Sequence, residues 1–462
     1  MKRGILFLLV AIIINVAVKA NIRLPAIISN DMVLQQKSSV KLWGWGDPGE
    51  KVMVTTSWDN KVDSVKSNEN AKWQLAIQTP AAGGPYTITL KGNNTIVLQN
   101  VMVGEVWVCS GQSNMEMNYH WGLPQMKEDI PVANNPNIRF FHIPRNTAQT
   151  PQENGEGEWL LSDTNTVKWF SAVGYYFGKK LNAELNIPIG LIHASWGGTP
   201  GEVWTPAEVV ENNKVLKGAA LKQKKSNGWP IHPGYTYNAM INPVTNYAVA
   251  GAIWYQGESN TGTASTYTEL LTSLIKAWRQ KWGKEFPFYF VQLAPYNYGN
   301  NLKGAQLREA QTKTLSLSKT GMVVTTDLAD DTTDIHPRNK RDVGYRLASL
   351  AMAKTYDRPL KGAISPLYQT MAIDKNKIRL SFANAEDGLL QNGKTITGFF
   401  IAGADKRFYP AEAKLDGQSI IVWNKAVTQP VAVRYAFSNT AIGNVFNKER
   451  LPLSPFRTDD WE

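Results

Sequence analysis

Hydrophobic and polar residues alternate in short segments along residues 21–100 of this 462-residue chain. The segments SVKLWGWG, EKVMVTTSW, KWQLAIQT, PYTITLKG and NTIVLQN are separated by turn-forming stretches such as DPGE and AAGGP. A period of two is typical of strands with one buried face, and turns at this spacing favour packed antiparallel sheets. We therefore predict an N-terminal β-sandwich domain over residues 21–100.

Residues 101–360 carry a different pattern, in which apolar runs show no strict alternation. These runs are VMVGEVWVCSG, NIPIGLIHASWGG, AVAGAIWYQGES, FPFYFVQLAP and GMVVTTDLAD. Strands of parallel sheets have this composition because both of their faces are covered. Helical patterns lie between the runs, and the clearest one places Tyr267, Leu270, Leu274 and Trp278 on one face and ends at Gly283. Alternation of strand and helix predicts an α/β domain with a parallel sheet.

Short alternating segments return after residue 360, among them KIRLSFA, ITGFFIAG, SIIVWN and VAVRYAFS. They predict a C-terminal β-rich domain over residues 361–462. The expected architecture is an α/β core flanked by β-sandwich-like regions at both ends.

The first twenty residues combine Lys2 and Arg3 with an apolar run from Ile5 to Val18 and the small residue Ala20. This order predicts a signal peptide, residues 1–20, that is removed after Ala20. A retained anchor is the alternative, although the run is short for a membrane span and no second such run follows. We expect a periplasmic or secreted protein without stable membrane insertion.

Cysteine content and charge narrow the possible partners. Cys109 is the only cysteine, so an exported protein must be stable without an internal disulfide, and its apolar surroundings favour a packing role. The net charge is +11, but the basic residues are scattered along the chain rather than clustered. We therefore expect no nucleic-acid partner.

Polar and glycine-rich blocks follow the predicted parallel strands, at residues 110–114, 196–199, 256–260 and 327–336. Ligands of α/β sheets bind beyond the carboxyl ends of the strands, so these blocks are expected to meet at one edge. Together they contain the groups that acyl transfer needs. Ser113 is the predicted nucleophile, His336 the base, and Asp334 or Glu258 the orienting acid. The predicted oxyanion donors are the amides of Ser113 and Gly198 and the side chain of Gln256 or Asn260.

Each of these residues also has an ordinary structural use. A serine after a strand is usually a turn or helix cap, and a pair of glycines usually serves a tight bend. Of the other histidines, His193 is predicted to be a satisfied core residue. The sequence has no HExxH motif, no thiolate zinc site, no GxxxxGK[ST] loop and no GxSxG elbow. Elimination favours a serine esterase that uses no metal and no cofactor.

The same blocks resemble those of SGNH (GDSL-like) hydrolases, namely Gly111-Gln112-Ser113, Gly198, residues 256–260 and the late Asp–His pair. More narrowly, the chain resembles the sialate O-acetylesterase family in LPAIISNDMVLQQ, VWVCSGQSNMEM, WGGTPGEVW, YNAMINPV, IWYQGESN, DIHPRNKRDVGYRLA and LPLSPFRTDDW. The resemblance implies a flavodoxin-like central domain with a Ser–His site that removes O-acetyl groups from sialic acids or sialoglycans. Acetyl-xylan esterases share the serine and QGES blocks and are the main alternative. A non-catalytic glycan-binding protein is the alternative of another class.

One departure from the SGNH pattern concerns the third member of the site. Those hydrolases usually carry an aspartate three residues before the histidine, but this chain has Thr333 there and Asp334 only two residues before. We rank Asp334 first and Glu258 second, as the xylan esterases suggest. A main-chain carbonyl or Asp331 are further alternatives.

Aromatic and basic residues near the predicted edge are candidates for holding the sugar. Indole and phenol rings pack on the apolar faces of sugar rings, and a guanidinium pairs well with a carboxylate. We predict substrate contacts for Gln112, Trp196 and Arg338. Trp204, Trp254 and Tyr255 are further candidates, although core packing is at least as plausible for Trp254.

Overall fold

The computed structural model describes residues 21–461 except 359, 361 and 362. The predicted signal peptide, residues 1–20, lies outside the described residues. Within the described part of the chain, no helix is both long enough and apolar enough to cross a membrane.

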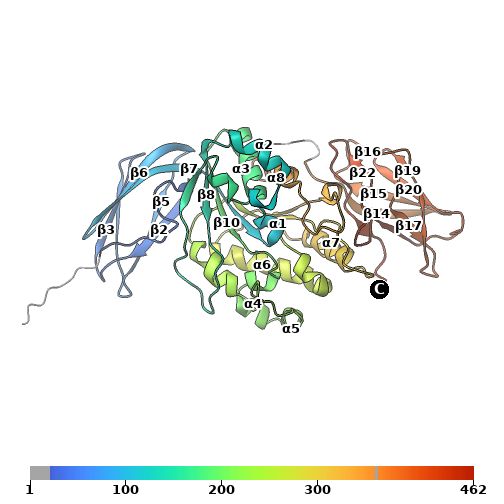
Figure 1. Cartoon of the computed structure of the whole chain (residues 1–462), viewed down its shortest axis with the longest axis horizontal. Helices are drawn as coiled ribbons and strands as arrows, with labels where there is room; N and C mark the ends of the chain where they lie inside the picture. The colour runs from blue at the N-terminus through green and yellow to red at the C-terminus, as the bar shows by residue number, and fades with distance from the viewer. Residues whose placement is uncertain (1–20, 359, 361–362, 462) are drawn as a thin grey trace, which may run out of the picture.

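A largely parallel sheet forms the centre of the molecule (Figure 1). Its strand order is β13-β12-β11-β7-β10-β8-β9, and every neighbouring pair is parallel except β8 and β9. The strands β8 and β9 extend the sheet beyond those that the sequence pattern predicts. The bounds are β7 (Thr95–Gly111), β8 (Asn135–His142), β9 (Trp159–Ser162), β10 (Ile189–Ser195), β11 (Gly251–Tyr255), β12 (Phe288–Val291) and β13 (Thr320–Val323).

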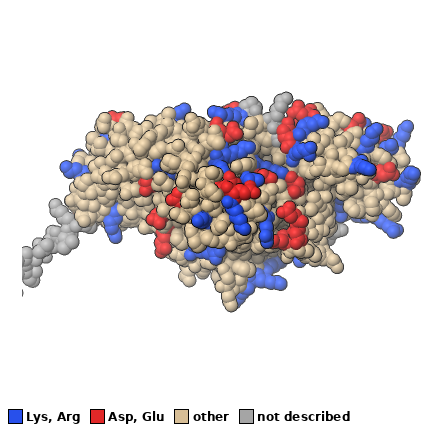
Figure 2. All heavy atoms as spheres, turned by 45° about the horizontal axis from the view of Figure 1, so that its top comes forward, with Lys and Arg blue, Asp and Glu red and all other residues tan. Residues whose placement is uncertain are grey.

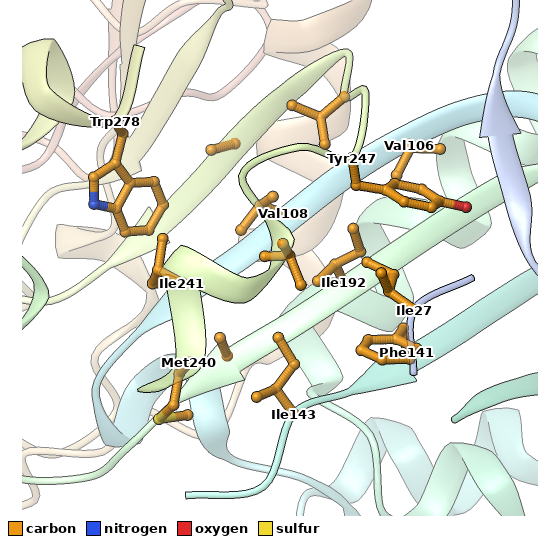
Figure 3. Close-up of a cluster of buried hydrophobic side chains, with 14 of the residues drawn as sticks. Ile27, Val106, Val108, Phe141, Ile143, Ile192, Met240, Ile241, Tyr247 and Trp278 are labelled. Atoms are coloured by element: carbon orange, nitrogen blue, oxygen red, sulfur yellow. The ribbon is translucent and has the colours of Figure 1, made fainter. Parts of the chain in front are cut away.

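Helices cover both faces of this sheet, and successive strand residues enter different cores. In β7, Val106 and Val108 belong to the cluster that contains Trp278 of α6, shown in Figure 3. Trp107 and Cys109 belong to a second cluster with residues of α3 and α8. Both faces are therefore apolar, which explains why the sequence of these strands does not alternate. The predicted α/β class with a parallel sheet is confirmed.

The helices are α1 (Ser113–Glu116), α2 (Pro124–Asp129), α3 (Ala172–Leu185), α4 (Ala207–Glu211), α5 (Lys214–Ala220), α6 (Tyr267–Trp282), α7 (Lys303–Thr314) and α8 (Lys340–Lys354). The apolar face predicted for α6 is buried, and the helix ends at Gly283, which adopts a left-handed φ of 62°. Glycine takes this conformation without a steric penalty, so it is a common residue at the end of a helix.

Strand β7 joins the N-terminal sheets to the central sheet. Its first part pairs antiparallel with β6 and parallel with β1, and its last part lies between β10 and β11. The predicted domain boundary between residues 100 and 101 falls inside this strand. The remaining N-terminal strands are β1 (Val33–Gln35), β2 (Ser39–Trp45), β3 (Lys51–Thr56), β4 (Val62–Lys66), β5 (Lys72–Gln78) and β6 (Gly83–Lys91).

Antiparallel sheets at the other end of the molecule enclose a separate core, which includes Leu380, Ile401 and Val422 (Figure 1). This region contacts α7, where the buried Arg308 donates to the carbonyl oxygen of Ser438. Its strands are β14 (Leu367–Asp374), β15 (Lys377–Ala383), β16 (Leu389–Gln391), β17 (Phe399–Ala402), β18 (Phe408–Pro410), β19 (Glu412–Asp416), β20 (Ser419–Trp423), β21 (Ala432–Tyr435), β22 (Val445–Asn447) and β23 (Phe456–Arg457). The boundary predicted after residue 360 adjoins residues that the structure does not describe.

Charged side chains of both signs are interspersed on the face of the molecule in Figure 2. This face carries no broad area of one sign, in agreement with the scattered basic residues of the sequence.

Candidate active site

Three neighbouring strands of the central sheet end side by side. Gly111 at the end of β7 is in register with Ser195 of β10 and with Tyr255 of β11. The amide of Gln112 donates to the carbonyl oxygen of Tyr255 (3.0 Å), and the amide of Trp196 donates to that of Gly111 (3.2 Å). The polar blocks that follow these strands therefore begin at one edge of the sheet, as predicted.

Gly111 allows this close approach of the strand ends. Its φ is 140°, and a Cβ atom at this position would lie 2.1 Å from the carbonyl oxygen of Tyr255. A side chain at position 111 would clash with the backbone of Tyr255. That backbone cannot move away without breaking the pairing of β7 and β11. The chain then turns directly into the short helix α1, whose first residue is Ser113.

The structure brings the predicted nucleophile and the predicted base together. Ser113 Oγ lies 3.0 Å from Nε2 of His336, although the two residues are 223 positions apart in the chain. Ser113 is 7% exposed, whereas the side chain of His336, in the loop before α8, is 29% exposed. This is the hydrogen-bond geometry of a serine that a histidine can deprotonate.

Asp334 lies on the other side of the His336 ring. Its Oδ1 atom is 3.7 Å from Nδ1 of His336 and accepts a 2.9 Å hydrogen bond from the His336 amide. Burial and the charge of Lys340 lower the pKa of His336, and the charge of Asp334 opposes that shift. The imidazole is therefore neutral, and able to accept a proton, at lower pH than an ordinary histidine.

Glu258, the second candidate for the orienting acid, takes part in a buried network centred on Asn114. Asn114 Nδ2 donates to Glu258 Oε1 (2.5 Å) and to the carbonyl oxygen of Ile335 (3.1 Å), and Asn114 Oδ1 accepts from Lys340 Nζ (2.5 Å). In the described structure, the side-chain hydrogen bond of Glu258 thus goes to Asn114 and not to His336.

Burial shifts the proton affinities of both charged groups in this network. It raises the pKa of Glu258, while hydrogen bonds and Lys340 oppose the shift. It lowers the pKa of Lys340 to about 7, against the opposing charges of Glu258 and Asp334. Sequence patterns missed Asn114 and Lys340. The only sequence signal for each is its position, because Asn114 follows Ser113 and Lys340 lies four residues after His336.

Gln256 and Asn260, two of the predicted oxyanion donors, are held in a second buried network. The Gln256 amide donates to Asn260 Oδ1 (2.7 Å) and to the carbonyl oxygen of Thr199 (3.3 Å). The Asn260 amide donates to Glu202 Oε2 (2.9 Å) and weakly to Thr263 (3.5 Å). Their N–H groups have protein acceptors here, so the donor role of these two side chains stays a prediction.

The loop after β10 borders Ser113. A Cβ atom on Gly197 would lie 3.3 Å from Cβ of Ser113, and the Gly197 amide donates to Glu116 Oε2 (2.8 Å). Gly198 follows with a φ of 79°, and its carbonyl oxygen accepts from Ser259 Oγ (2.8 Å). The predicted donors Ser113 and Gly198 thus belong to adjoining segments of the site.

The predicted substrate contacts differ in exposure. Gln112 is buried, and its Oε1 atom accepts from the amides of Gly257 and Ser259 (both 3.4 Å). Trp196 is half-buried and donates to the carbonyl oxygen of Gly228 (3.1 Å), and Arg338 is exposed. Their roles in substrate binding remain predictions.

Trp204, Trp254 and Tyr255 cannot contact a sugar, because all three are fully buried. Trp254 packs edge-on against Trp204 and Trp278 in the core, so the expectation of substrate contact is wrong for these three rings. A different ring, Trp121, lies 5.4 Å from the ring centre of His336 and is 41% exposed. No sequence pattern distinguishes Trp121 from the other aromatic residues.

A second serine–histidine contact lies at the end of β10. Ser195 Oγ is 2.5 Å from His193 Nε2, and His193 Nδ1 is 3.0 Å from His142 Nδ1. Ser195 and His193 are both buried, as the sequence predicts for His193, and so is Cys109. The described residues contain no group of three His, Cys, Asp or Glu side chains placed to hold a metal ion.

Comparison with known proteins places this chain in a class. The family model described as "Carbohydrate esterase, sialic acid-specific acetylesterase" matches residues 103–353. Human sialate O-acetylesterase is 32% identical over 373 residues, covering 72% of this chain and 71% of the human protein. The mouse enzyme is 29% identical, covering 94% of this chain and 93% of its own. A crystal structure of a carbohydrate acetylesterase from Xanthomonas citri superposes with a TM-score of 0.88 at 36% identity, over 96% of this chain and all of that one.

The protein is thus an enzyme, a carboxylic ester hydrolase of the carbohydrate-esterase class. Within that class, the chain belongs to the sialic acid-specific acetylesterase family. The alternative of a non-catalytic glycan-binding protein is therefore set aside.

Proposed function

We propose that this enzyme removes O-acetyl groups from sialic acids through an acyl-enzyme intermediate on Ser113. The observation that carries the mechanism is the 3.0 Å contact between Ser113 Oγ and His336 Nε2 at the carboxyl edge of the sheet. The family supports the substrate class. The fold and the blocks at the strand ends also support assigning the central domain to the flavodoxin-like SGNH hydrolases.

In the proposed reaction, Ser113 Oγ attacks the acetyl carbonyl carbon while His336 Nε2 takes the hydroxyl proton. The negative charge on the carbonyl oxygen is stabilised by the amides of Ser113 and Gly198, and loss of one such donor costs about 3 kcal/mol of barrier. The tetrahedral intermediate collapses when the protonated imidazole gives its proton to the departing sugar oxygen. Water, deprotonated by His336, then attacks the acetyl-serine, and acetate and free Ser113 result.

We assign the orientation of the His336 ring to Asp334 in preference to Glu258. Asp334 Oδ1 is 3.7 Å from Nδ1 of the ring, so a small rotation brings it into hydrogen-bond distance. The hydrogen bond of Glu258 to Asn114 supports a different role, which is to hold the segment of Ser113 against the loop of His336.

The second Ser–His pair of the chain provides a matched control for the nucleophile. We expect Ser113→Ala to lower the turnover of p-nitrophenyl acetate on the order of 10³-fold or more, because the acyl-enzyme cannot form. Ser195→Ala also removes a serine hydrogen-bonded to a histidine, but its partner is His193 and not the proposed base His336, so the turnover of this variant should stay near wild type. Unchanged turnover in Ser113→Ala would disprove the proposed nucleophile.

The substrate class is tested by comparing two acetylated carbohydrates. We expect kcat/KM for an O-acetylated sialic acid to exceed that for acetylated xylan, with acetate release as the measurement. A clear preference for xylan would identify the enzyme as an acetyl-xylan esterase while leaving the Ser113 mechanism intact.

We also propose that the mature enzyme is periplasmic or secreted. The support is the charge and hydropathy pattern of residues 1–20.

A further inference from the structure

A cavity of about 340 Å³ lies beside the loop that borders Ser113. Its lining includes Gly198 and Pro200 from the segment after β10 and Ser259, Thr261 and Gly262 from the segment after β11. The rest of the lining comes from the segment after α5 and from the start of α7 and the residues before it. It includes three lysines and an aromatic ring, namely Lys222, Lys224, Lys303 and Trp229. We refer to this cavity as the basic pocket.

The basic pocket adjoins the proposed nucleophile through Gly197 and Gly198. A Cβ atom added to Gly197 would lie 3.3 Å from the Cβ atom of Ser113. The next residue, Gly198, lines the pocket. Ser259, which follows Glu258 and also lines the pocket, donates to the carbonyl oxygen of Gly198. A sugar with its acetyl group at Ser113 therefore has this cavity as neighbouring space.

The charge of the pocket is one-sided. Among the residues that the structure describes, none of the ammonium groups of Lys222, Lys224 and Lys303 forms a salt bridge or hydrogen bond, and all three residues are exposed. No Asp or Glu lines the pocket. Like charges gathered from separate segments without a counter-charge create a positive potential that attracts an anion. Lysine pairs with carboxylates as a point charge, without demanding one fixed geometry.

A larger cavity, of about 640 Å³, has the opposite character. It lies beyond Glu116, and its lining includes Glu156 and Glu158 together with aromatic rings such as Trp169 and Phe170. Carboxylates repel an anionic substrate group from this cavity. The two cavities near the Ser113 segment thus carry lining charges of opposite sign. An acidic sugar should therefore bind with its carboxylate toward the basic pocket.

We propose that the basic pocket holds the carboxylate of an O-acetylated sialic acid, with Lys222, Lys224 and Lys303 as the residues that select an acidic over a neutral sugar. This inference rests on the proposed function. In it, the three lysines, and not the exposed Arg338, are the main partners of the carboxylate. Trp229 lies against Gly198 and is 39% exposed, so its ring offers the sugar an apolar surface beside the charges.

The test compares an O-acetylated sialic acid with the same sugar in which the carboxylate is converted to the neutral primary amide. We expect the wild-type enzyme to prefer the carboxylate about tenfold or more in kcat/KM, since charge-assisted contacts are lost in the amide. In the triple variant Lys222→Gln/Lys224→Gln/Lys303→Gln the preference should fall to near one. The matched control Lys51→Gln/Lys66→Gln/Lys91→Gln removes the same charge from exposed strands of the N-terminal sheets and should keep the preference.

Two further measurements keep the result interpretable. Higher ionic strength should raise the wild-type KM for the carboxylate and not for the amide, which requires no variant. The Arg338→Gln variant should retain the preference for the carboxylate. Loss of the preference in Arg338→Gln, or its persistence in the triple lysine variant, would overturn the pocket assignment and leave the proposed function intact. If the wild-type enzyme hydrolyses p-nitrophenyl acetate but not acetylated sialic acid, both the proposed substrate and the pocket assignment fail.

Discussion

His336 lies between two charges of opposite effect. Lys340, four residues further along the chain, lowers its pKa, and Asp334, two residues before it, raises it. The lysine is buried and bonded to Asn114, whereas the side chain of Asp334 is 42% exposed. At the scale of single residues, burial is the main cause that lowers the pKa of the proposed base, and two charges within four positions shift it in opposite directions.

The acidic limb of the pH profile of kcat/KM should report the pKa of His336, because the free enzyme needs a neutral imidazole. Lys340→Gln removes the charge that lowers the His336 pKa, so the limb should move to higher pH. Asp334→Asn removes the charge that raises it, so the limb should move to lower pH, and kcat should fall roughly 10- to 100-fold as the ring loses its orienting acid. The measurement is the pH profile with p-nitrophenyl acetate.

Lys354→Gln is the control for the lysine variant, because it removes a lysine at the opposite end of α8 and should leave the limb in place. Shifts of the limb in the same direction for Lys340→Gln and Asp334→Asn would contradict the assigned electrostatics.

At the scale of elements, the site depends on how closely the ends of β7, β10 and β11 approach one another. Gly111 is the residue that permits this approach, since an added Cβ would meet the backbone oxygen of Tyr255. Gly283 also has a positive φ, but no atom lies within 4 Å of a Cβ added there. Gly111 is therefore required because there is no space for a side chain, whereas Gly283 is favoured only by its backbone conformation.

We expect Gly111→Ala to destabilise the protein by about 3 kcal/mol or more, because backbone has to move to relieve the clash. Gly283→Ala should cost only about 1 kcal/mol, the price of a left-handed alanine. Thermal denaturation measures both effects, and the esterase assay should show loss of activity only for Gly111→Ala. Equal destabilisation of the two variants would contradict the packing argument.

At the scale of the whole molecule, the hydrophobic clusters do not follow the three predicted domains. Leu42 of the N-terminal strands and Leu274 of α6 belong to one continuous cluster, and β7 runs through both regions. The C-terminal sheets enclose their own cluster. We therefore expect the N-terminal and central regions to unfold together, while the C-terminal region has a core of its own.

Calorimetry of core variants tests this coupling. Leu42→Ala and Leu274→Ala each remove a buried side chain and should lower the midpoint of the same unfolding transition, by the equivalent of roughly 2–5 kcal/mol. Ile401→Ala in the C-terminal core should lower a different transition. Midpoints that move independently for Leu42→Ala and Leu274→Ala would show that β7 does not couple the two regions.

Local sequence pattern was sufficient for the elements that depend on local periodicity. The buried runs of β10, β11 and β12 and the face and end of α6 follow from hydropathy and from Gly283, because burial of an apolar face and a left-handed helix end are encoded within a few residues. The short edge strands β8 and β9 carry weaker signals, and the role of Trp254 was ambiguous because a buried and a substrate-facing indole have the same sequence signal.

By itself, the sequence determined the α/β class, the strands whose ends carry polar blocks, and the choice of Ser113 and His336 as the candidate pair. Only the tertiary structure decided which acid lies beside the His336 ring, that Asn114 and Lys340 join the segments behind it, and which cavity is basic. The physical reason is that these properties depend on distances between residues far apart in the chain and on burial, which shifts charge and pKa, and neither is written in local periodicity.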